Sequence, residues 1–419
     1  MDKIIIDGGR RLHGKVKISG SKNAALPLMA ASILSRGLNV FENVPDLMDI
    51  HTMARLLHGF GVEVKEKRGV LKIRADKIKK AEAPYDLVRT MRASVLVLGP
   101  LLGRLGHARV SLPGGCAIGA RPINRHLKAF EEMGAKIRLE GGYVEAACPK
   151  LTGARIVFDD ITVTGTENVM MAAVLAKGAT VIENSAREPE VPELANYLNR
   201  MGARITGAGT DTITIEGVDE LNGADYKIMP DRIEAGTFAI ASAMTGGDVL
   251  VQGVAPEHIS SLIAKLREAG GVITEEDHSI HVIGPREVKN VDVSTQPYPG
   301  FATDFQAQFT SMMCLARGTS LVSENIFENR FMHVAELNRM GANIKLDGNS
   351  AVVTGVEQLI GAPVMATDLR ASACLILAGL MARGITEIHR VYHLDRGYEH
   401  IERKFRKLGA RVKRGKVKY

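Results

Sequence analysis

The sequence predicts an α/β protein built as two similar domains, and three observations support this fold class. The chain has 419 residues, which is too long for one ordinary core. A short pattern recurs six times, and two kinds of helix alternate between the copies. Apolar residues make up 45% and charged residues 24% of the chain, a composition typical of a globular protein.

The recurring pattern is a helical run, a small or apolar residue, a glycine and the start of a strand. Each glycine is expected to end its helix in the left-handed conformation, where a residue without a side chain is favoured. A spacing of 68 to 73 residues is longer than that of the usual solenoid repeats, so we expect six α/β units rather than a solenoid. The matched glycines are Gly61, Gly134, Gly202, Gly270, Gly341 and Gly409.

The helices that alternate with these are apolar nearly all round, as in residues 169–176 and 374–382. A helix of this kind must be buried on all sides, whereas residues 262–269 keep one polar face, as a surface helix does. Each repeat is therefore expected to hold one buried helix and one surface helix. Three repeats would form each domain, with a hinge near Met229 and Pro230. Alternating apolar residues predict short strands at 71–74, 212–216, 279–283 and 351–354.

Charged and hydroxyl residues recur just before the buried helices, where backbone N–H groups are unpaired. Lys22, Arg92 and Arg370 are cations at helix N-termini and so oppose the helix dipole, which suggests that a bound anion offsets the repulsion. The segments concerned are 21–23, 89–92, 164–167, 230–232, 303–304 and 367–370.

Ser, Thr and Asp at such positions are also ordinary N-caps. For Asp231, Thr166 and Thr303 taken alone, capping is the preferred interpretation.

One segment, 112–122, holds three glycines and two prolines around Cys116 and Arg121, so it predicts a loop that carries a thiol beside a cation. From this environment alone, a functional thiol and an incidental loop thiol stay equally open. Cys148, Cys314 and Cys374 are expected to be small buried hydrophobic residues. Their wide separation argues against a disulfide framework or a structural zinc site.

The net charge of +7 favours acidic partners, while the absence of Trp and the 5% aromatic content disfavour nucleic acid as the main ligand. No bilayer-length apolar run and no signal-peptide pattern is present, so we expect a cytoplasmic protein without a membrane partner. No motif for nucleotide hydrolysis, zinc proteolysis or dinucleotide binding occurs. His126 is expected to be a polar surface residue rather than a metal ligand.

Beyond these patterns, the whole chain resembles the UDP-N-acetylglucosamine enolpyruvyl transferases, which are 1-carboxyvinyltransferases. Long motifs carry the resemblance in order and in register, including 112–122 with Cys116 and 303–308 with Asp304. One departure is 162–165, Thr-Val-Thr-Gly, where many relatives have Ser-Val-Gly. The other motifs are 18–27, 90–94, 186–190, 230–234, 327–331, 366–371 and 394–399.

The resemblance implies an inside-out α/β barrel in two domains, each of three units. Domain one would span 22–229 and carry the lid loop 112–122, while domain two would combine 1–21 with 230–419. The active site would lie in the cleft between them. The substrates implied are phosphoenolpyruvate and UDP-N-acetylglucosamine, with no cofactor and no metal. No oligomeric state is predicted.

The implied reaction transfers the enolpyruvyl group to the 3-hydroxyl of the sugar and releases phosphate by addition and elimination, in the first committed step of peptidoglycan synthesis. By resemblance, the phosphoenolpyruvate contacts would be Lys22, Asn23, Arg121, Arg370 and Arg396. The nucleotide-sugar contacts would be Arg92, Arg121, Pro122, Ile123, Asn124, Arg125, Thr162, Val163, Asp304 and Ile326.

In the same family Cys116 would donate a proton to the enol carbon, and Asp304 would be the base for the sugar hydroxyl. Asp368 would help to move the second proton, and Lys22 and Arg396 complete the implied catalytic set. The proton assignments among Asp304, Asp368 and Lys22 stay open. With Cys rather than Asp in the loop, covalent inactivation by fosfomycin is expected.

Two rival readings are weaker. The sibling enolpyruvyl-shikimate-phosphate synthases share fold and cosubstrate but lack the Pro-Gly-Gly-Cys loop. A noncatalytic repeat protein that binds nucleic acid through a basic surface would not need the matching Asp, Arg and Cys positions, and it would show steep salt-dependent retention on DNA.

Overall fold

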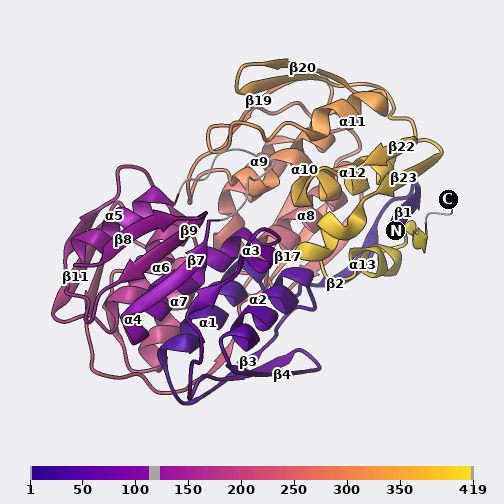
Figure 1. The fold of residues 1–419 in the computed structure, drawn as a ribbon. Helices are drawn as coiled ribbons and strands as arrows, with labels where there is room; N and C mark the ends of the chain where they lie inside the picture. The colour runs from indigo at the N-terminus through magenta and orange to yellow at the C-terminus, as the bar shows by residue number, and fades with distance from the viewer. Residues whose placement is uncertain (1, 113–122, 417–419) are drawn as a thin grey trace. The chain divides into compact units, whose positions relative to one another are not determined.

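A computed structural model describes residues 2–112 and 123–416 (Figure 1). The described residues fall into two compact units. Unit 1 consists of residues 2–19 and 230–416, and unit 2 of residues 20–112 and 123–229. Each unit has its own hydrophobic core and is an inside-out α/β barrel, with buried helices at its centre and four-stranded sheets around them.

One plan underlies all six repeats. In every repeat a short strand runs parallel to a neighbouring strand, and a buried helix precedes that neighbour. The helix connects the two strands directly in four repeats, whereas in the first and fourth the short strand comes from a distant part of the chain. A surface helix follows, and in the first five repeats it leads into an antiparallel hairpin that completes the sheet. The described residues form six such sheets, so the predicted sixfold repeat with two kinds of helix is confirmed.

Unit 2 contains the first three repeats. The first has β14 (Asp225–Lys227), α1 (Lys22–Ala31), η1 (Ser32–Leu34), β3 (Leu38–Glu42), α2 (Met48–Gly59), β4 (Glu63–Lys67) and β5 (Val70–Arg74). The second has β6 (Glu82–Ala83), α3 (Tyr85–Val88), η2 (Arg92–Val97), α4 (Leu98–Leu105), β7 (His107–Ser111), α5 (Asn124–Glu132), β8 (Lys136–Glu140) and β9 (Tyr143–Ala147). The third has β10 (Arg155–Val157), α6 (Val163–Ala173), β11 (Ala179–Glu183), α7 (Glu190–Arg200), β12 (Arg204–Thr206) and β13 (Thr212–Glu216).

Unit 1 contains the other three. The fourth repeat has β2 (His13–Lys17), α8 (Arg232–Met244), β15 (Asp248–Gln252), η3 (Pro256–Ile259), α9 (Ser260–Glu268), β16 (Val272–Glu276) and β17 (Ser279–Ile283). The fifth has β18 (Val293–Ser294), α10 (Thr303–Met313), β19 (Thr319–Ser323), α11 (His333–Arg339), β20 (Asn343–Asp347) and β21 (Ser350–Thr354). The sixth has β22 (Pro363–Met365), α12 (Leu369–Met381), β23 (Ile385–His389), η4 (Val391–Arg396), α13 (Ile401–Lys407), β24 (Arg411–Lys416) and β1 (Asp2–Asp7).

The first strand of the chain completes the last repeat. β1 lies antiparallel to both β23 and β24, so it occupies the place that a hairpin strand fills in the other sheets. Figure 1 shows this as an indigo strand beside the yellow end of the chain. The two ends of the sequence are therefore joined in one sheet of unit 1.

The helix ends follow the predicted chemistry. All six matched glycines have φ between 89° and 108°, the left-handed conformation that closes a helix. The buried helices depart from expectation in one repeat, where Arg92 opens a 3₁₀ segment before α4 instead of a regular helix. Within residues 2–112 and 123–416, no helix is both long and apolar enough to cross a membrane.

The predicted N-caps are right in one case of three. The Asp231 carboxylate accepts hydrogen bonds from the first-turn amides of α8. Thr166 and Thr303 are not caps, because α6 and α10 begin earlier than the sequence suggested, with Thr162 and Ala302 as their N-cap residues. The hydroxyl of Thr166 instead accepts a hydrogen bond from the amide of Ala186.

Candidate active site

The strongest cluster of charges in unit 1 surrounds Asp304, the second residue of α10. Arg330 donates to Asp304 Oδ1 at 2.6 Å, and Arg370 donates to Oδ2 at 2.7 Å. The two arginine side chains are 6% and 5% exposed, while the carboxylate is 24% exposed. One carboxylate therefore holds two nearly buried cations and still reaches solvent.

This environment controls the protonation of Asp304. Burial opposes its ionisation, but the charges of Arg370 and Arg330 outweigh burial and hold the pKa of Asp304 well below its usual range. Arg370 responds in the opposite direction, because its neighbour Asp304 raises the pKa of the guanidinium against the effect of burial. Asp304 is thus an ionised carboxylate at neutral pH, and a weak base while both arginines contact it.

A buried polar network also binds Arg370, through the guanidinium nitrogen that does not contact Asp304. Its second guanidinium nitrogen donates to the Tyr398 hydroxyl at 3.2 Å, and the guanidinium carbon lies 5.6 Å from the centre of that ring. The Tyr398 hydroxyl lies 2.9 Å from Thr237 Oγ1, and Gln308 donates its amide to it at 3.2 Å. Tyr398, itself held by residues of α8 and α10, thus sets the position of the guanidinium on α12.

Asp368 is the N-cap of α12 and accepts hydrogen bonds from the amides of Arg370 and Ala371. Two histidines feel its charge. Burial lowers the pKa of His333 to about 4 and also lowers the pKa of His393, which the cation Arg396 lowers further. The predicted residues Asp304, Asp368 and Arg370 therefore lie on two adjacent helix ends in unit 1, with Arg396 in the η4 segment that packs against α12.

In unit 2, Lys22 and Asn23 are the first two residues of α1, which is capped by Ser21. The ammonium group of Lys22 lies 3.4 Å from the carboxylate of Asp49, and the two side chains are 12% and 5% exposed. The predicted cation at this helix mouth therefore has a buried counter-charge, which offsets the opposing helix dipole.

A second group in unit 2 is organised by His126, which is 2% exposed. The expectation that it is a surface residue is wrong, because α5 turns it inward between α6 and η2. Asn168 donates one amide hydrogen to Val95 O at 2.9 Å and the other to His126 Nδ1 at 3.1 Å. Since Nδ1 accepts, the ring carries its proton on Nε2, which faces Thr164 Oγ1 at 3.4 Å.

This histidine stays neutral at physiological pH. Burial lowers its pKa to about 3, helped by the charges of Arg92 and Arg125. Two predicted nucleotide-sugar contacts, Arg92 and Arg125, therefore act electrostatically on one imidazole. Arg125 also forms an ion pair with Asp160.

The remaining predicted contacts in unit 2 lie at two neighbouring helix starts. Ile123 precedes α5, Asn124 opens it, and Thr162 caps α6 by accepting from the amide of Gly165 at 3.2 Å. Val163 is the first residue of α6. The α5 and α6 helices contact each other, so these residues gather on one part of unit 2.

Other predictions separate into three groups. Ile326 lies in unit 1, in the segment after β19. Cys116, Arg121 and Pro122 lie outside the described residues. Cys148, Cys314 and Cys374 are buried as expected, and burial raises the pKa of the Cys314 thiol to about 12. No cluster of potential metal ligands occurs among the residues that the structure describes.

The sequence reading missed three residues that organise the site. Arg330 stands inside the motif 327–331 but follows no predicted helix start, which is why it was not singled out. Asn168 directly precedes the apolar run of α6, whereas Glu324 lies between Ser323 and Asn325, and both are buried. A buried polar residue beside an apolar run is the signal that could have identified Asn168.

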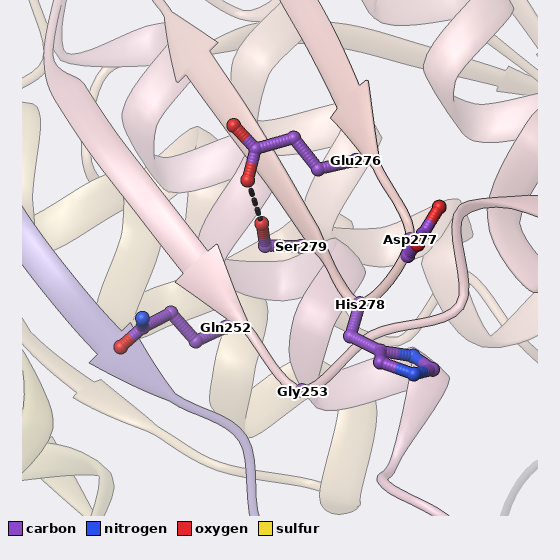
Figure 2. Close-up of a pocket in the computed structure, with 6 residues that line it drawn as sticks. All are labelled: Gln252, Gly253, Glu276, Asp277, His278 and Ser279. Carbon is purple, nitrogen blue, oxygen red and sulfur yellow. Dashed lines mark hydrogen bonds between the residues drawn. The ribbon is translucent and has the colours of Figure 1, made fainter.

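A hollow of about 740 Å³ lies away from these clusters, at the turn between β16 and β17 (Figure 2). Ser279 donates a hydrogen bond to Glu276 at 2.7 Å there. None of the predicted site residues lines it. Its lining residues are Gln252, Gly253, Glu276, Asp277, His278 and Ser279.

Comparisons with known proteins show the family to which this chain belongs. The family model described as EPSP synthase (3-phosphoshikimate 1-carboxyvinyltransferase) matches residues 6–405. A protein of Trichlorobacter lovleyi named UDP-N-acetylglucosamine 1-carboxyvinyltransferase is 60% identical over 415 residues, covering 99% of each chain. A protein of the same name from Myxococcus xanthus is 58% identical over 420 residues and covers 100% of both chains.

Solved structures support the fold. The enolpyruvyl transferase NikO from Streptomyces tendae superposes with a TM-score of 0.89 at 24% identity, covering 100% of this chain and 99% of that one. An EPSP synthase from Acinetobacter baumannii superposes with a TM-score of 0.78 at 18% identity, covering 99% of this chain and 100% of that one. Both likenesses confirm the predicted enolpyruvyl transferase fold.

Proposed function

This chain belongs to the UDP-N-acetylglucosamine 1-carboxyvinyltransferase family, and we propose that it transfers the enolpyruvyl group of phosphoenolpyruvate to the 3-hydroxyl of UDP-N-acetylglucosamine. The transfer releases phosphate and serves peptidoglycan synthesis. The observation that supports the chemistry most directly is the carboxylate of Asp304, held between Arg330 and Arg370 and still partly open to solvent. We further propose that domain one spans 22–229 and domain two spans 1–21 and 230–419.

In this proposal the cations bind anions. The phosphate and carboxylate of phosphoenolpyruvate bind to Lys22, Asn23, Arg121, Arg370 and Arg396. Cations that are already fixed in place stabilise a crowded anionic intermediate without having to reorganise.

The nucleotide sugar takes the second set of contacts. Burial and the charges of Arg92 and Arg125 keep the imidazole of His126 neutral, so these two arginines supply the positive charge that binds a diphosphate. Ile123, Asn124, Thr162 and Val163 lie at the adjoining helix starts. Pro122 and Ile326 complete the contacts in this proposal.

Asp304 becomes a base only when its surroundings change. While both arginines contact it, its pKa lies well below the usual range, so it accepts a proton poorly. An anionic substrate that recruits Arg370 would remove one of these contacts and raise the pKa of Asp304. Phosphoenolpyruvate would therefore prepare the base that removes the proton from the sugar hydroxyl.

The second proton step belongs to Cys116 in this proposal. Its thiol donates a proton to the methylene carbon of the enol as the sugar oxygen forms its bond to the adjacent carbon. Elimination then removes a proton from the methyl group that the addition created and expels phosphate from the adjacent carbon, which restores the carbon–carbon double bond with the sugar oxygen still attached. Asp368 assists this proton transfer. Lys22 assists by holding the departing phosphate.

The direct test is phosphate release from phosphoenolpyruvate with UDP-N-acetylglucosamine or with shikimate 3-phosphate as acceptor. Release that requires the nucleotide sugar and falls at least about a hundredfold in Cys116→Ala supports the proposal. Release with shikimate 3-phosphate alone would move the chain to the sibling reaction.

A covalent probe provides a second test. Fosfomycin is expected to inactivate the enzyme by alkylating the Cys116 thiol, and mass spectrometry would locate the adduct. Full activity after saturating treatment, with Cys116 unmodified, would argue against the assigned role of that thiol.

A further inference from the structure

Glu324 is a buried carboxylate that lies directly after β19, beside the Asp304 cluster of unit 1. It is 3% exposed, and its backbone amide donates to Asn349 O at 2.8 Å. No lysine or arginine among the described residues forms an ion pair with it; hydrogen bonds from neutral groups satisfy its charge instead. A carboxylate kept in such a place without a cation needs a reason, because its desolvation is costly.

Four donors converge on this carboxylate. Oε1 accepts from the amide of Ile326 at 2.9 Å, the amide of Phe327 at 3.2 Å and the hydroxyl of Thr295 at 2.9 Å. Oε2 accepts from the hydroxyl of Thr303 at 2.8 Å. One oxygen therefore holds the loop that carries Ile326, and the other holds the first residue of α10.

The direction of every bond in this network is fixed. An ionised carboxylate only accepts, so Thr303 must donate its hydroxyl hydrogen to Glu324. The Thr303 oxygen is then left to accept from Arg330 at 3.1 Å. The other terminal nitrogen of Arg330 donates to Asp304 at 2.6 Å. The polar chain runs without interruption from Glu324 to the carboxylate of Asp304.

The same logic fixes the loop. Thr295 must also donate to Glu324, and its oxygen accepts from the amide of Asn325 at 2.8 Å. Three consecutive amides of residues 325–327 are thus held by Glu324, directly or through Thr295. The ring of Phe327 in turn lies 5.2 Å from the guanidinium carbon of Arg330. Glu324 therefore anchors both the loop of residues 325–327 and Arg330.

We propose that Glu324 is a positioning residue that sets the loop carrying Ile326 and the Arg330–Asp304 pair with one carboxylate. Binding of the nucleotide sugar and activation of its hydroxyl would then depend on the same anchor. The inference rests on the proposed function, since Ile326 and Asp304 act there on one substrate. A merely structural clamp would alter stability and leave the kinetic parameters unchanged.

Glu324→Gln tests the anchor with little change of shape. The glutamine amide has one oxygen that accepts and one NH₂ group that donates. In either orientation of the amide, the donors that bind Oε1 or those that bind Oε2 in Glu324 would therefore face an NH₂ group. We expect kcat to fall about tenfold and the KM for UDP-N-acetylglucosamine to rise about tenfold. Because Arg330 would hold Asp304 less well, the acid limb of the kcat–pH profile should move to higher pH.

Two variants that each remove one hydroxyl test separately the link from Glu324 to Arg330 and the link from Glu324 to the loop. Thr303→Val cuts only the link to Arg330, so kcat should fall and the acid limb should move while KM stays within about twofold. Thr295→Val cuts only the loop link, so KM should rise while kcat stays within about twofold. Thr310→Val is the matched control, because this buried hydroxyl of the same helix donates only to Gln306 O at 2.8 Å, and neither parameter should change.

Several outcomes would overturn the inference. Glu324→Gln with wild-type kcat, KM and pH profile would do so, whether or not its melting temperature falls. If Glu324→Gln does not fold, Thr303→Val and Thr295→Val decide: unchanged kinetics in both would reject the anchor. A wild-type enzyme that releases no phosphate with the nucleotide sugar would instead reject the proposed function, so the two failures are distinguishable.

Discussion

The α6 helix of unit 2 and the α10 helix of unit 1 have polar residues at the same positions, but these residues have different partners. Each is an 11-residue buried helix with a polar second residue, Thr164 or Asp304, and a buried amide at the sixth position, Asn168 or Gln308. Each amide donates a hydrogen bond to a neighbouring helical segment, Asn168 to Val95 O and Gln308 to Thr237 Oγ1.

The partners of the second residue make the difference. In α6, Thr164 faces a histidine that burial keeps neutral, whereas in α10, Asp304 faces two arginines. The start of α6 therefore lies beside a neutral ring, whereas the start of α10 carries an ionised carboxylate held between two cations. The repeated helix thus places polar side chains at equivalent positions, and the residue type at the second position determines the charge there.

The largest effect should follow from removing the charge of Asp304. In Asp304→Asn two nearly buried arginines lose their counter-charge, so we expect about a thousandfold loss of kcat and about 2–3 kcal/mol of stability, at or just below the usual range for a broken buried pair because Asp304 is partly exposed. Steady-state kinetics and urea unfolding measure both. Thr164→Val is the matched change in α6 and should cost less than about 1 kcal/mol; an equal loss in both would break the comparison.

The neutral histidine predicts a pH effect on the unit 2 side. The folded pKa of His126, about 3, lies below the unfolded value of about 6.5, so its contribution to stability is present above that pH and is lost as pH falls. His126→Asn keeps an acceptor for Asn168 but does not titrate. Between pH 6.5 and 5, wild type should lose about 1.6 kcal/mol in total relative to this variant. Parallel pH dependence of the two unfolding free energies would contradict the buried neutral ring.

Glu167 provides a third test, because this buried carboxyl of α6 shifts in the direction opposite to Asp304. Burial raises its pKa well above the usual value, and Glu190 and Glu188 raise it further. Its stability contribution is present at acid pH and is lost as pH rises towards the folded pKa. Glu167→Gln should therefore gain about 1 kcal/mol or more over wild type between pH 5 and 9. Urea unfolding at both pH values measures it, and a gain that does not grow with pH would refute the shift.

The smallest effect is expected behind Arg370. Tyr398→Phe removes one hydrogen bond from this guanidinium but keeps the ring beside it, so about 1 kcal/mol is at stake. The KM for phosphoenolpyruvate should rise about three- to fivefold with kcat nearly unchanged. A loss confined to kcat would mean that Tyr398 acts on Asp304 rather than on substrate binding.

Much of the fold could be predicted, because each repeat is marked by local sequence signals. Glycines that close helices and the all-apolar runs of α6 and α12 are sequence signals that need no partner. The fate of β1 was different. Its place between β23 and β24 depends on residues nearly 400 positions away, so only resemblance could assign it.

Asp304 and Arg370 could be singled out from the sequence because each lies at the start of a buried helix. Their partners could not be predicted where these came from irregular segments. Arg330 and Glu324 follow β19 in a stretch with no periodic pattern, and His126 looks polar in sequence but faces inward because Asn168 satisfies it. Burial of a polar residue depends on the partner that folding brings to it, and the sequence does not name that partner.

The most direct test is to incubate wild type and Asp304→Asn with phosphoenolpyruvate and UDP-N-acetylglucosamine, and to follow the nucleotide sugar by mass spectrometry together with phosphate release. The account predicts that wild type adds one enolpyruvyl group per phosphate released, and that Asp304→Asn does so about a thousandfold more slowly. An unmodified nucleotide sugar with wild type, or equal rates for the two proteins, would contradict it.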